Sequence, residues 1–273
     1  MNFDIFQTVG PNDFSIIKDT LKQNRKKIIG YDNIYLFSEI KSFDIKGVKN
    51  IHPSFFPFSI NYIEQKMQNN KRAGWIYAQL VKLYYPYLQT KKEYILVLDS
   101  DVFFTKPIKF FNELNQPLFT VSDEHHIPYF IHMKKLHPEF NKNYIKSGIS
   151  HHMILKKDLI KSMFAKVEDY HNKPFFEVFI EMLDLNENSP ASEYEIYLNY
   201  VLNEHTDTYN TREINWKNTN KLNKRDFEKY SMISLPHYAG TRPNDFFKNI
   251  IKKDLRRALN SFINFIFLKF NKF

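Results

Sequence analysis

The chain has 273 residues, of which 43% are hydrophobic and 25% charged, so it can bury a substantial core and is not a disordered protein. The absence of cysteine excludes disulfides and thiolate chemistry, and no stretch approaches the roughly 20 apolar residues of a membrane-spanning helix. The formal charge of +9 favours an anionic partner such as a nucleotide, nucleic acid or acidic membrane. Residues 1–10 lack the apolar core of a secretory signal, so we expect a cytoplasmic protein.

Strands and helices are expected to alternate from the start of the chain. The opening pattern is β-α-β, with a strand at residues 4–9, a turn and helix cap at 10–13, a helix to about residue 24 and a strand at 34–38. This spacing is short enough for a parallel sheet. A loop or sheet edge with two prolines follows at residues 51–58, and then a helical pattern at 60–85 that is broken near 71–74 and stops at Pro86.

The run YILVL at residues 94–98 is apolar without interruption and is bounded by charged residues. Such a run is typical of a strand buried on both faces, at the centre of a parallel sheet. The remaining elements are predicted as strands at 118–121, 149–155, 207–211 and 230–235, and as helices at 158–167, 174–185 and 193–203. We therefore predict a single α/β domain over residues 1–243, with a mostly parallel central sheet flanked by helices.

The motif Asp99, Ser100, Asp101 follows the buried strand directly. Ligands of open α/β sheets bind beyond the carboxyl ends of the strands, and residues two apart in extended backbone point to the same side. Two carboxylates at this place repel each other unless a cation lies between them, which favours Mg²⁺ or Mn²⁺ completed by phosphate oxygens. The alternative is structural: Asp99 caps a turn and Asp101 forms a surface ion pair.

A family resemblance rests on this motif and on the order of others. Residues 94–107 (YILVLDSDVFFTKP) resemble the metal-binding motif of GT-A fold, DxD-containing glycosyltransferases. The order of motifs from Arg72 to Gly240 is similar to a group of bacterial glycosyltransferase-like proteins, through Arg72, Gly74, Trp75, Gln79 and Lys82, then LDSD, SGISHHMILKKDL, SEYEIY and HYAG. The resemblance implies a Rossmann-like GT-A domain that uses a nucleotide-diphosphate sugar and Mn²⁺ or Mg²⁺. The acceptor would be a glycan in surface polysaccharide or lipooligosaccharide synthesis.

The resemblance also implies roles for both ends of the domain. In the resembled fold the first strand and its turn bind the nucleobase and ribose, although an ordinary turn explains the pattern equally well. A histidine from the C-terminal segment often binds the metal, and His237 is the residue that matches. Arg242, together with Lys217 or Lys221, would neutralise the departing diphosphate. The donor-binding residues expected at the first turn are Thr8, Val9, Gly10 and Asp13.

Three polar residues before the buried strand share one helical face, because the series Arg72, Trp75, Gln79 and Lys82 recurs at spacings of three and four. This face would grip diphosphate and sugar hydroxyls, while the neighbouring Trp75 is more typical of packing. Ser100 completes the expected donor contacts.

The segment around Gly148 is expected to contact the substrate. His151 and His152 are neighbours ahead of a strand, so at most one of them faces the site. We expect a sugar contact from these residues, and from Tyr194, in preference to metal ligation.

The start of the 193–203 helix supplies the candidate catalytic carboxylates. Ser192 and Glu195 match a capping box, in which the glutamate reaches back to the cap. Glu193 is then the first candidate for the base of an inverting transferase, and Glu195 the second because helix starts shift by a residue or two. In a retaining enzyme Glu193 would only position the acceptor.

Residues 244–273 form a basic tail, with apolar residues recurring at spacings of three and four over 245–265. A cationic amphipathic helix suits an anionic membrane, where a lipid-linked acceptor would be held, so we expect peripheral association with the inner face of the membrane. Packing against the domain or an oligomer contact is the alternative, and the sequence does not determine the oligomeric state.

Two other functions compete with a glycosyltransferase. A nucleotidyltransferase acting on sugar phosphates would show a glycine-rich basic loop after the first strand, whereas this chain has Gly10-Pro11-Asn12-Asp13 there. A non-enzymatic nucleic-acid-binding protein would interleave aromatic and basic residues along its domain, whereas the densest basic cluster here lies in the tail. We therefore expect no nucleic-acid partner.

Overall fold

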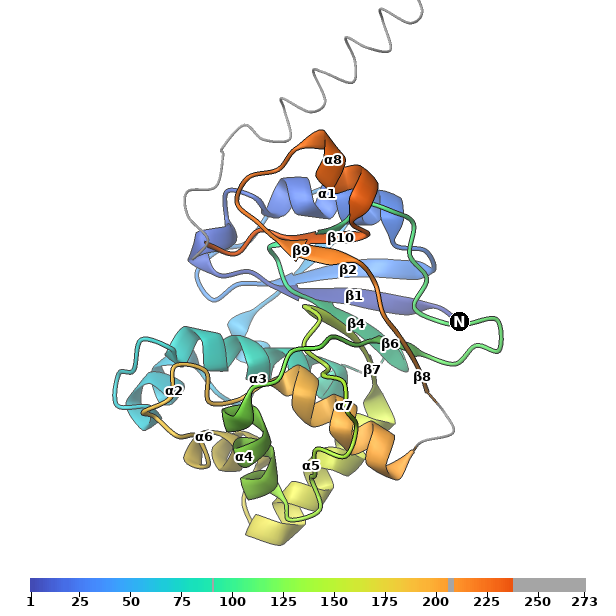
Figure 1. The fold of residues 1–273 in the computed structure, drawn as a ribbon. Coiled ribbons are helices and arrows are strands. Elements are labelled where there is room, and N and C mark those ends of the chain that lie inside the picture. Colours follow the sequence, from blue (N-terminus) through green and yellow to red (C-terminus); the bar gives the residue numbers. More distant parts are fainter. Residues whose placement is uncertain (90, 206–208, 238–273) are drawn as a thin grey trace, which may run out of the picture.

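A five-stranded sheet forms the centre of the computed structural model, which describes residues 1–89, 91–205 and 209–237. Its order is β3-β2-β1-β4-β7, with neighbours parallel except for β7, which runs antiparallel to β4. The strands are β1 (Phe3–Thr8), β2 (Tyr31–Phe37), β3 (Val48–Ile51), β4 (Tyr94–Leu98) and β7 (His152–Lys156). Figure 1 shows α1 (Ile17–Lys27) on one side of this sheet, and α3 (Ala73–Leu88) and α7 (Glu193–Glu204) on the other. The predicted α/β fold class, a mostly parallel sheet flanked by helices, is confirmed.

Shorter elements complete the described chain. Two small sheets, of order β5-β10-β9 and β6-β8, were not predicted, although two of their strands fall within predicted segments. The remaining helices are η1 (Pro11–Asp13), η2 (Pro53–Phe55), α2 (Ile60–Lys66), α4 (Ile127–Leu136), α5 (Lys157–His171), α6 (Phe175–Glu181) and α8 (Lys224–Lys229). The strands of the small sheets are β5 (Val102–Phe104), β6 (Leu118–Thr120), β8 (Asn210–Arg212), β9 (Trp216–Asn218) and β10 (Met232–Ser234).

Three local predictions were wrong. The helix before β4 does not stop at Pro86 but continues to Leu88, because a proline in the last turn removes a single hydrogen bond while the surrounding side chains are buried. The helix expected over residues 174–185 ends at Glu181. No element was predicted over α4, which starts with a proline in its first turn, a position that tolerates the missing N–H.

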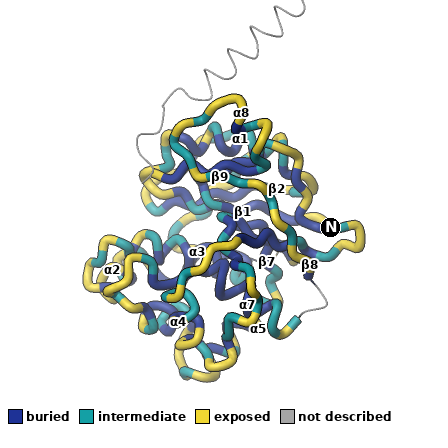
Figure 2. The backbone as a smooth tube through the Cα atoms, viewed as in Figure 1, coloured by how far each residue is buried: buried dark blue, intermediate teal, exposed yellow. Residues whose placement is uncertain are grey.

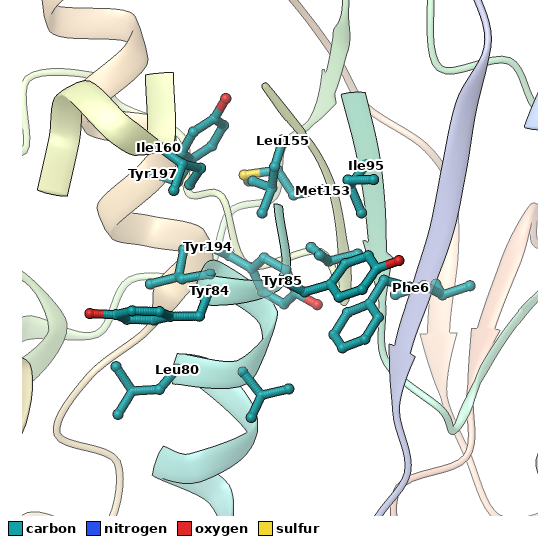
Figure 3. Packing of buried hydrophobic residues seen from close by; sticks show 14 of the residues in the cluster. Phe6, Leu80, Tyr84, Tyr85, Ile95, Met153, Leu155, Ile160, Tyr194 and Tyr197 are labelled. Carbon is teal, nitrogen blue, oxygen red and sulfur yellow. The ribbon is translucent and has the colours of Figure 1, made fainter. Parts of the chain in front are cut away.

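Strand β4 is buried over its whole length, as its apolar sequence predicted. It lies between β1 and β7, and Figure 2 shows buried backbone at the middle of the molecule where these strands run. On the α3 side, Phe6 of β1 stacks on Tyr85 with ring centroids 4.0 Å apart. Figure 3 shows these two side chains next to each other. Phe6 also pairs with Val97 near the end of β4, so this packing borders the residues that follow β4.

His152, the first residue of β7, is part of this core and is 1% exposed. Its Nε2 lies 2.9 Å from Thr120 Oγ1, and its ring meets the edges of Phe104 and Phe110. Burial, with the nearby charge of Arg212, lowers the pKa of His152 to about 3. The side chain is therefore neutral at physiological pH and belongs to the fold.

The predicted C-terminal helix, the basic tail and Arg242 lie outside the described residues. Among the helices that the structure describes, none combines the length and apolar character that crossing a bilayer demands.

His152 predicts a pH dependence of stability. Its folded pKa lies below the ordinary value of about 6.5, so the unfolded state binds its proton first and stability falls as pH drops below about 6.5. Between pH 7.5 and 5.0 this group alone should remove about 2 kcal/mol. In urea titrations His152→Gln should lose that much less stability over the interval than the wild type. An equal loss in both proteins would contradict the assignment.

Candidate functional site

The residues after β1 and β4 meet at one edge of the sheet. The carboxylate of Asp13, in η1, accepts a hydrogen bond from Ser100 Oγ, and Gln7 Nε2 donates to Asp99 O at 3.2 Å. Thr20 of α1 donates to Ser100 O at 2.9 Å. Three separate elements therefore hold residues 99 and 100 in place where the parallel strands end, which is where ligands of such sheets bind.

Asp99 accepts three side-chain contacts. Lys82 Nζ lies 2.6 Å and Tyr194 OH 2.9 Å from Oδ1, and His151 Nδ1 lies 3.2 Å from Oδ2. The ammonium of Lys82 also lies 4.6 Å from the centroid of the Tyr194 ring. Asp99 therefore joins α3, α7 and the segment before β7.

Lys82 is shared by two carboxylates. Its Nζ lies 2.5 Å from Glu193 Oε1 as well as 2.6 Å from Asp99, and the three side chains expose 8%, 5% and 25% of their surface respectively. Burial alone would lower the pKa of Lys82, but the two carboxylates raise it above its ordinary value. Lys82 is therefore a permanent cation at the position beside Asp99 where the sequence suggested a metal ion.

The pKa values of Asp99 and Glu193 are shifted in opposite directions. Burial alone would raise the pKa of Asp99, but the charge of Lys82 and the hydrogen bond from His151 outweigh it and keep that pKa below its ordinary range. Burial raises the pKa of Glu193 against the opposing charge of Lys82. Asp99 is thus held ionised, whereas Glu193 has the greater tendency to take up a proton.

Asp101 is half-buried, as Asp99 is, but its backbone is tied to the segment that follows the C-terminal strand. The N–H of Leu235, which directly follows β10, donates to Asp101 O at 2.9 Å. His237, two residues further on, is the last described residue and is exposed. Segments more than 130 positions apart in the chain therefore meet at the end of the motif.

These donors fit a divalent ion that takes few protein ligands. Over residues 1–89, 91–205 and 209–237, no three or more histidine, aspartate or glutamate side chains surround a common point. Mg²⁺ characteristically binds one or two carboxylates and completes its shell with substrate phosphates and water. Asp101, with the remaining lone pairs of Asp99, would meet this requirement only together with a phosphate-bearing substrate.

Arg72, Gln79 and Lys82 lie along one face of α3, and this face contacts the segment that leads into α7. Gln79 accepts from Glu193 N at 3.1 Å and donates to Ala191 O at 3.2 Å. The guanidinium carbon of Arg72 lies 4.2 Å from the centroid of the Trp75 ring, and Arg72 Nη2 donates to Ser189 Oγ at 3.5 Å. Gln79 therefore holds the helix start that carries Glu193.

The predicted capping box is half present. Ser192 caps α7 by accepting from Glu195 N at 3.3 Å, but the Glu195 carboxylate does not return to the cap. It accepts instead from Ser147 Oγ at 2.7 Å and Gly148 N at 2.8 Å, and it pairs with Lys142. The reciprocal contact was predicted wrongly because a sequence pattern does not show a distant loop that offers better donors.

Gly148 lies against α7, not in open space. A Cβ at this position would lie 2.7 Å from Tyr194 O and 3.0 Å from Leu198 Cβ, so only glycine allows this close approach. The two histidines that follow diverge: His151 contacts Asp99, whereas His152 enters the core. The cause is not the strand alternation that was predicted, because His151 has left-handed backbone and lies before β7.

The first turn is placed beside the motif through Asp13. Val9 is buried and donates its N–H to Phe37 O, while nothing lies within 4 Å of the Cβ position of Gly10. Thr8, at the end of β1, is half-buried. Among these four residues, Asp13 reaches the motif through its hydrogen bond with Ser100.

Sequence reasoning missed two aromatic residues at this site. Trp216 of β9 meets the ring of His151 at 5.0 Å, edge to face. Tyr129 of α4 lies near Arg72 and Glu193, and burial raises its pKa to about 12. No motif indicates either residue, because they lie in β9 and α4, which were not predicted. The rarity of tryptophan, which occurs at two positions in the chain, was the one signal that could have drawn attention to Trp216.

Comparison with known proteins places the chain in a family. A family model described as "Family of unknown function (DUF6492)" matches residues 6–232. The chain belongs to this family. The family match extends from β1 to β10 and therefore includes the residue 99–101 edge. No curated protein matches the chain. Among solved structures it is similar to the apo form of mouse xyloside xylosyltransferase 1, with 10% identity and a TM-score of 0.45, covering 88% of this chain and 100% of that one.

Removing the shared cation should destabilise the fold. Lys82→Met leaves Asp99 and Glu193 buried without compensation, so we expect a loss of about 3–5 kcal/mol in the free energy of unfolding at pH 7. Lys109→Met is the matched control, because Lys109 pairs with Glu113 on the surface and should cost less than about 1 kcal/mol. Urea denaturation measures both, and equal effects would show that Lys82 is not the required counter-ion.

Proposed function

We propose that the chain is a metal-dependent glycosyltransferase that moves a sugar from a nucleotide-diphosphate sugar to a glycan acceptor. The observation that carries the proposal is the convergence of Asp13, Ser100, Asp99 and Asp101 at the carboxyl ends of the parallel strands, next to a fixed lysine. An acidic loop at this edge suits a phosphate-bearing ligand only together with a divalent ion. The motif resemblance described above supports the same activity.

On the donor side, Asp101, Asp99 and His237 would hold Mn²⁺ or Mg²⁺. The ion would stabilise the negative charge that grows on the departing diphosphate. Asp13, with Thr8, Val9 and Gly10, would bind the nucleoside, and Arg72 and Arg242 would approach the phosphates. Lys82 would keep Asp99 ionised and oriented, and Gln79 would hold the start of α7.

On the acceptor side, Glu193 would take the proton of the attacking hydroxyl. The acceptor oxygen forms a bond to the anomeric carbon while the bond from that carbon to the diphosphate oxygen breaks, and the proton passes to the carboxylate. Burial raises the pKa of Glu193, which suits a base. Glu195 is fully buried and accepts from Ser147, Gly148 and Asn199, so we assign it the positioning of the 147–148 turn.

The proposed acceptor is a glycan or a lipid-linked glycan of surface polysaccharide or lipooligosaccharide synthesis. Residues 244–273 would bring the domain to an anionic membrane surface where such an acceptor is held. The anomeric configuration of the product, read by NMR, decides whether Glu193 acts as a base or positions the acceptor.

The activity is tested with a panel of nucleotide sugars. The correct donor should raise the thermal midpoint in the presence of Mn²⁺ and not in EDTA, because a ligand stabilises the state that binds it. Asp101→Asn should lower donor hydrolysis and transfer by at least about 100-fold while the midpoint without ligand stays within a few degrees of the wild type. Asp123→Asn is the matched control, since Asp123 is an exposed loop residue paired with Lys146. Full activity in Asp101→Asn would reject the proposal.

A further inference from the structure

The backbone of His151 is held in an uncommon conformation. Its φ is 61°, in the left-handed region that residues with a side chain rarely adopt. Such a conformation persists only where several surrounding contacts hold it in place, and it is common at ligand-binding sites. Here the His151 carbonyl accepts the N–H of Asp99 at 3.0 Å, which ties the strained residue to the motif itself.

The imidazole ring is oriented from two sides. Nδ1 lies 3.2 Å from Asp99 Oδ2, and the ring meets Trp216 at 5.0 Å with an interplanar angle of 74°. Asp99 is in turn fixed by Lys82 and Tyr194. The direction of Nε2 therefore follows from contacts on α3, α7 and β9.

Nε2 of His151 is the remaining polar atom of this ring. It is buried, and no hydrogen-bond partner lies within reach among the residues that the structure describes. Buried polar atoms in folded proteins are almost always paired, and an orphan needs an explanation. A strained residue oriented by three elements, whose far nitrogen has no partner, indicates a contact made by a ligand.

The chemistry of the ring indicates which group that ligand offers. A carboxylate only accepts, so Nδ1 carries the hydrogen in the bond to Asp99. Nε2 then accepts when the ring is neutral and donates when it is protonated. A hydroxyl group can pair with Nε2 in either state, whereas a phosphate oxygen can pair with one state only.

We infer that His151 Nε2 binds a hydroxyl of the transferred sugar, with Asp99 and Trp216 as the residues that position the ring. The inference rests on the proposed function, because the sugar lies beside Asp99 if the diphosphate it carries is bound at Asp101. It assigns one sugar hydroxyl to one nitrogen, and it makes Trp216 part of the donor site.

The variant His151→Asn removes the Nε2 contact and keeps the contact with Asp99. Asparagine tolerates the left-handed backbone, and its side-chain amide nitrogen takes the place of Nδ1 beside Asp99, but nothing replaces Nε2. His137→Asn is the control, because His137 follows α4 and contacts Phe140 and Tyr170. Both variants should keep the thermal midpoint within a few degrees of the wild type.

The experiment uses the donor found in the nucleotide-sugar screen and the series of its deoxy analogues, each lacking one sugar hydroxyl. In the wild type and in His137→Asn, loss of one particular hydroxyl should lower kcat/KM by about 10- to 100-fold. In His151→Asn, kcat/KM for the natural donor should already be lower than in the wild type by about this factor. Removal of the same hydroxyl should then change kcat/KM by less than about threefold.

The role of Trp216 is tested in the same series. Trp216→Ala should erase the discrimination at that hydroxyl, and Trp216→Phe, which retains an aromatic ring, should restore it. If the wild type turns over a donor and His151→Asn discriminates among the analogues as the wild type does, the inference is wrong while the proposed function stands. If the wild type turns over no nucleotide sugar, the proposed function itself fails.

Discussion

The ammonium of Lys82, buried between Asp99 and Glu193, is the interaction on which the arrangement of this site depends. It joins the middle of α3 to the end of β4 and to the start of α7. Without it two carboxylates would lie close together in a buried place, which is unfavourable unless one of them is protonated. The cation allows both to approach, and the hydrogen bonds of Tyr194 and His151 then fix which way Asp99 points.

This arrangement gives the two aspartates of the motif different tasks. Asp99 is paired with Lys82 and organises the surrounding side chains, whereas the backbone of Asp101 is bonded to Leu235, directly after β10. Different environments commonly assign different roles to neighbouring carboxylates. A phosphate-bearing ligand and its metal ion would therefore depend more on Asp101, and the shape of the site more on Asp99.

The sequence predicted the features that arise from local patterns. The apolar run of β4 identified a buried strand, the strand end located the motif, and the spacing of Arg72, Gln79 and Lys82 predicted their shared face. It could not predict partners chosen by packing: Tyr194 meets Asp99 across 95 positions, and Glu195 turns to Ser147 across 48. The sequence indicated that Asp99 and Asp101 repel each other. It did not show that Lys82, on the preceding helix, neutralises the charge of Asp99.

The edge formed by residues 99–101 should bind the diphosphate of a nucleotide sugar together with a divalent ion. A crystal grown with Mn²⁺ and a nucleoside diphosphate tests it directly through the anomalous signal of manganese. We expect a manganese peak within about 2.0–2.2 Å of an Asp101 carboxylate oxygen and of phosphate oxygens, with Lys82 still bound to Asp99. Nucleotide and metal bound at another place, or a well-ordered nucleotide at this edge without manganese, would contradict it.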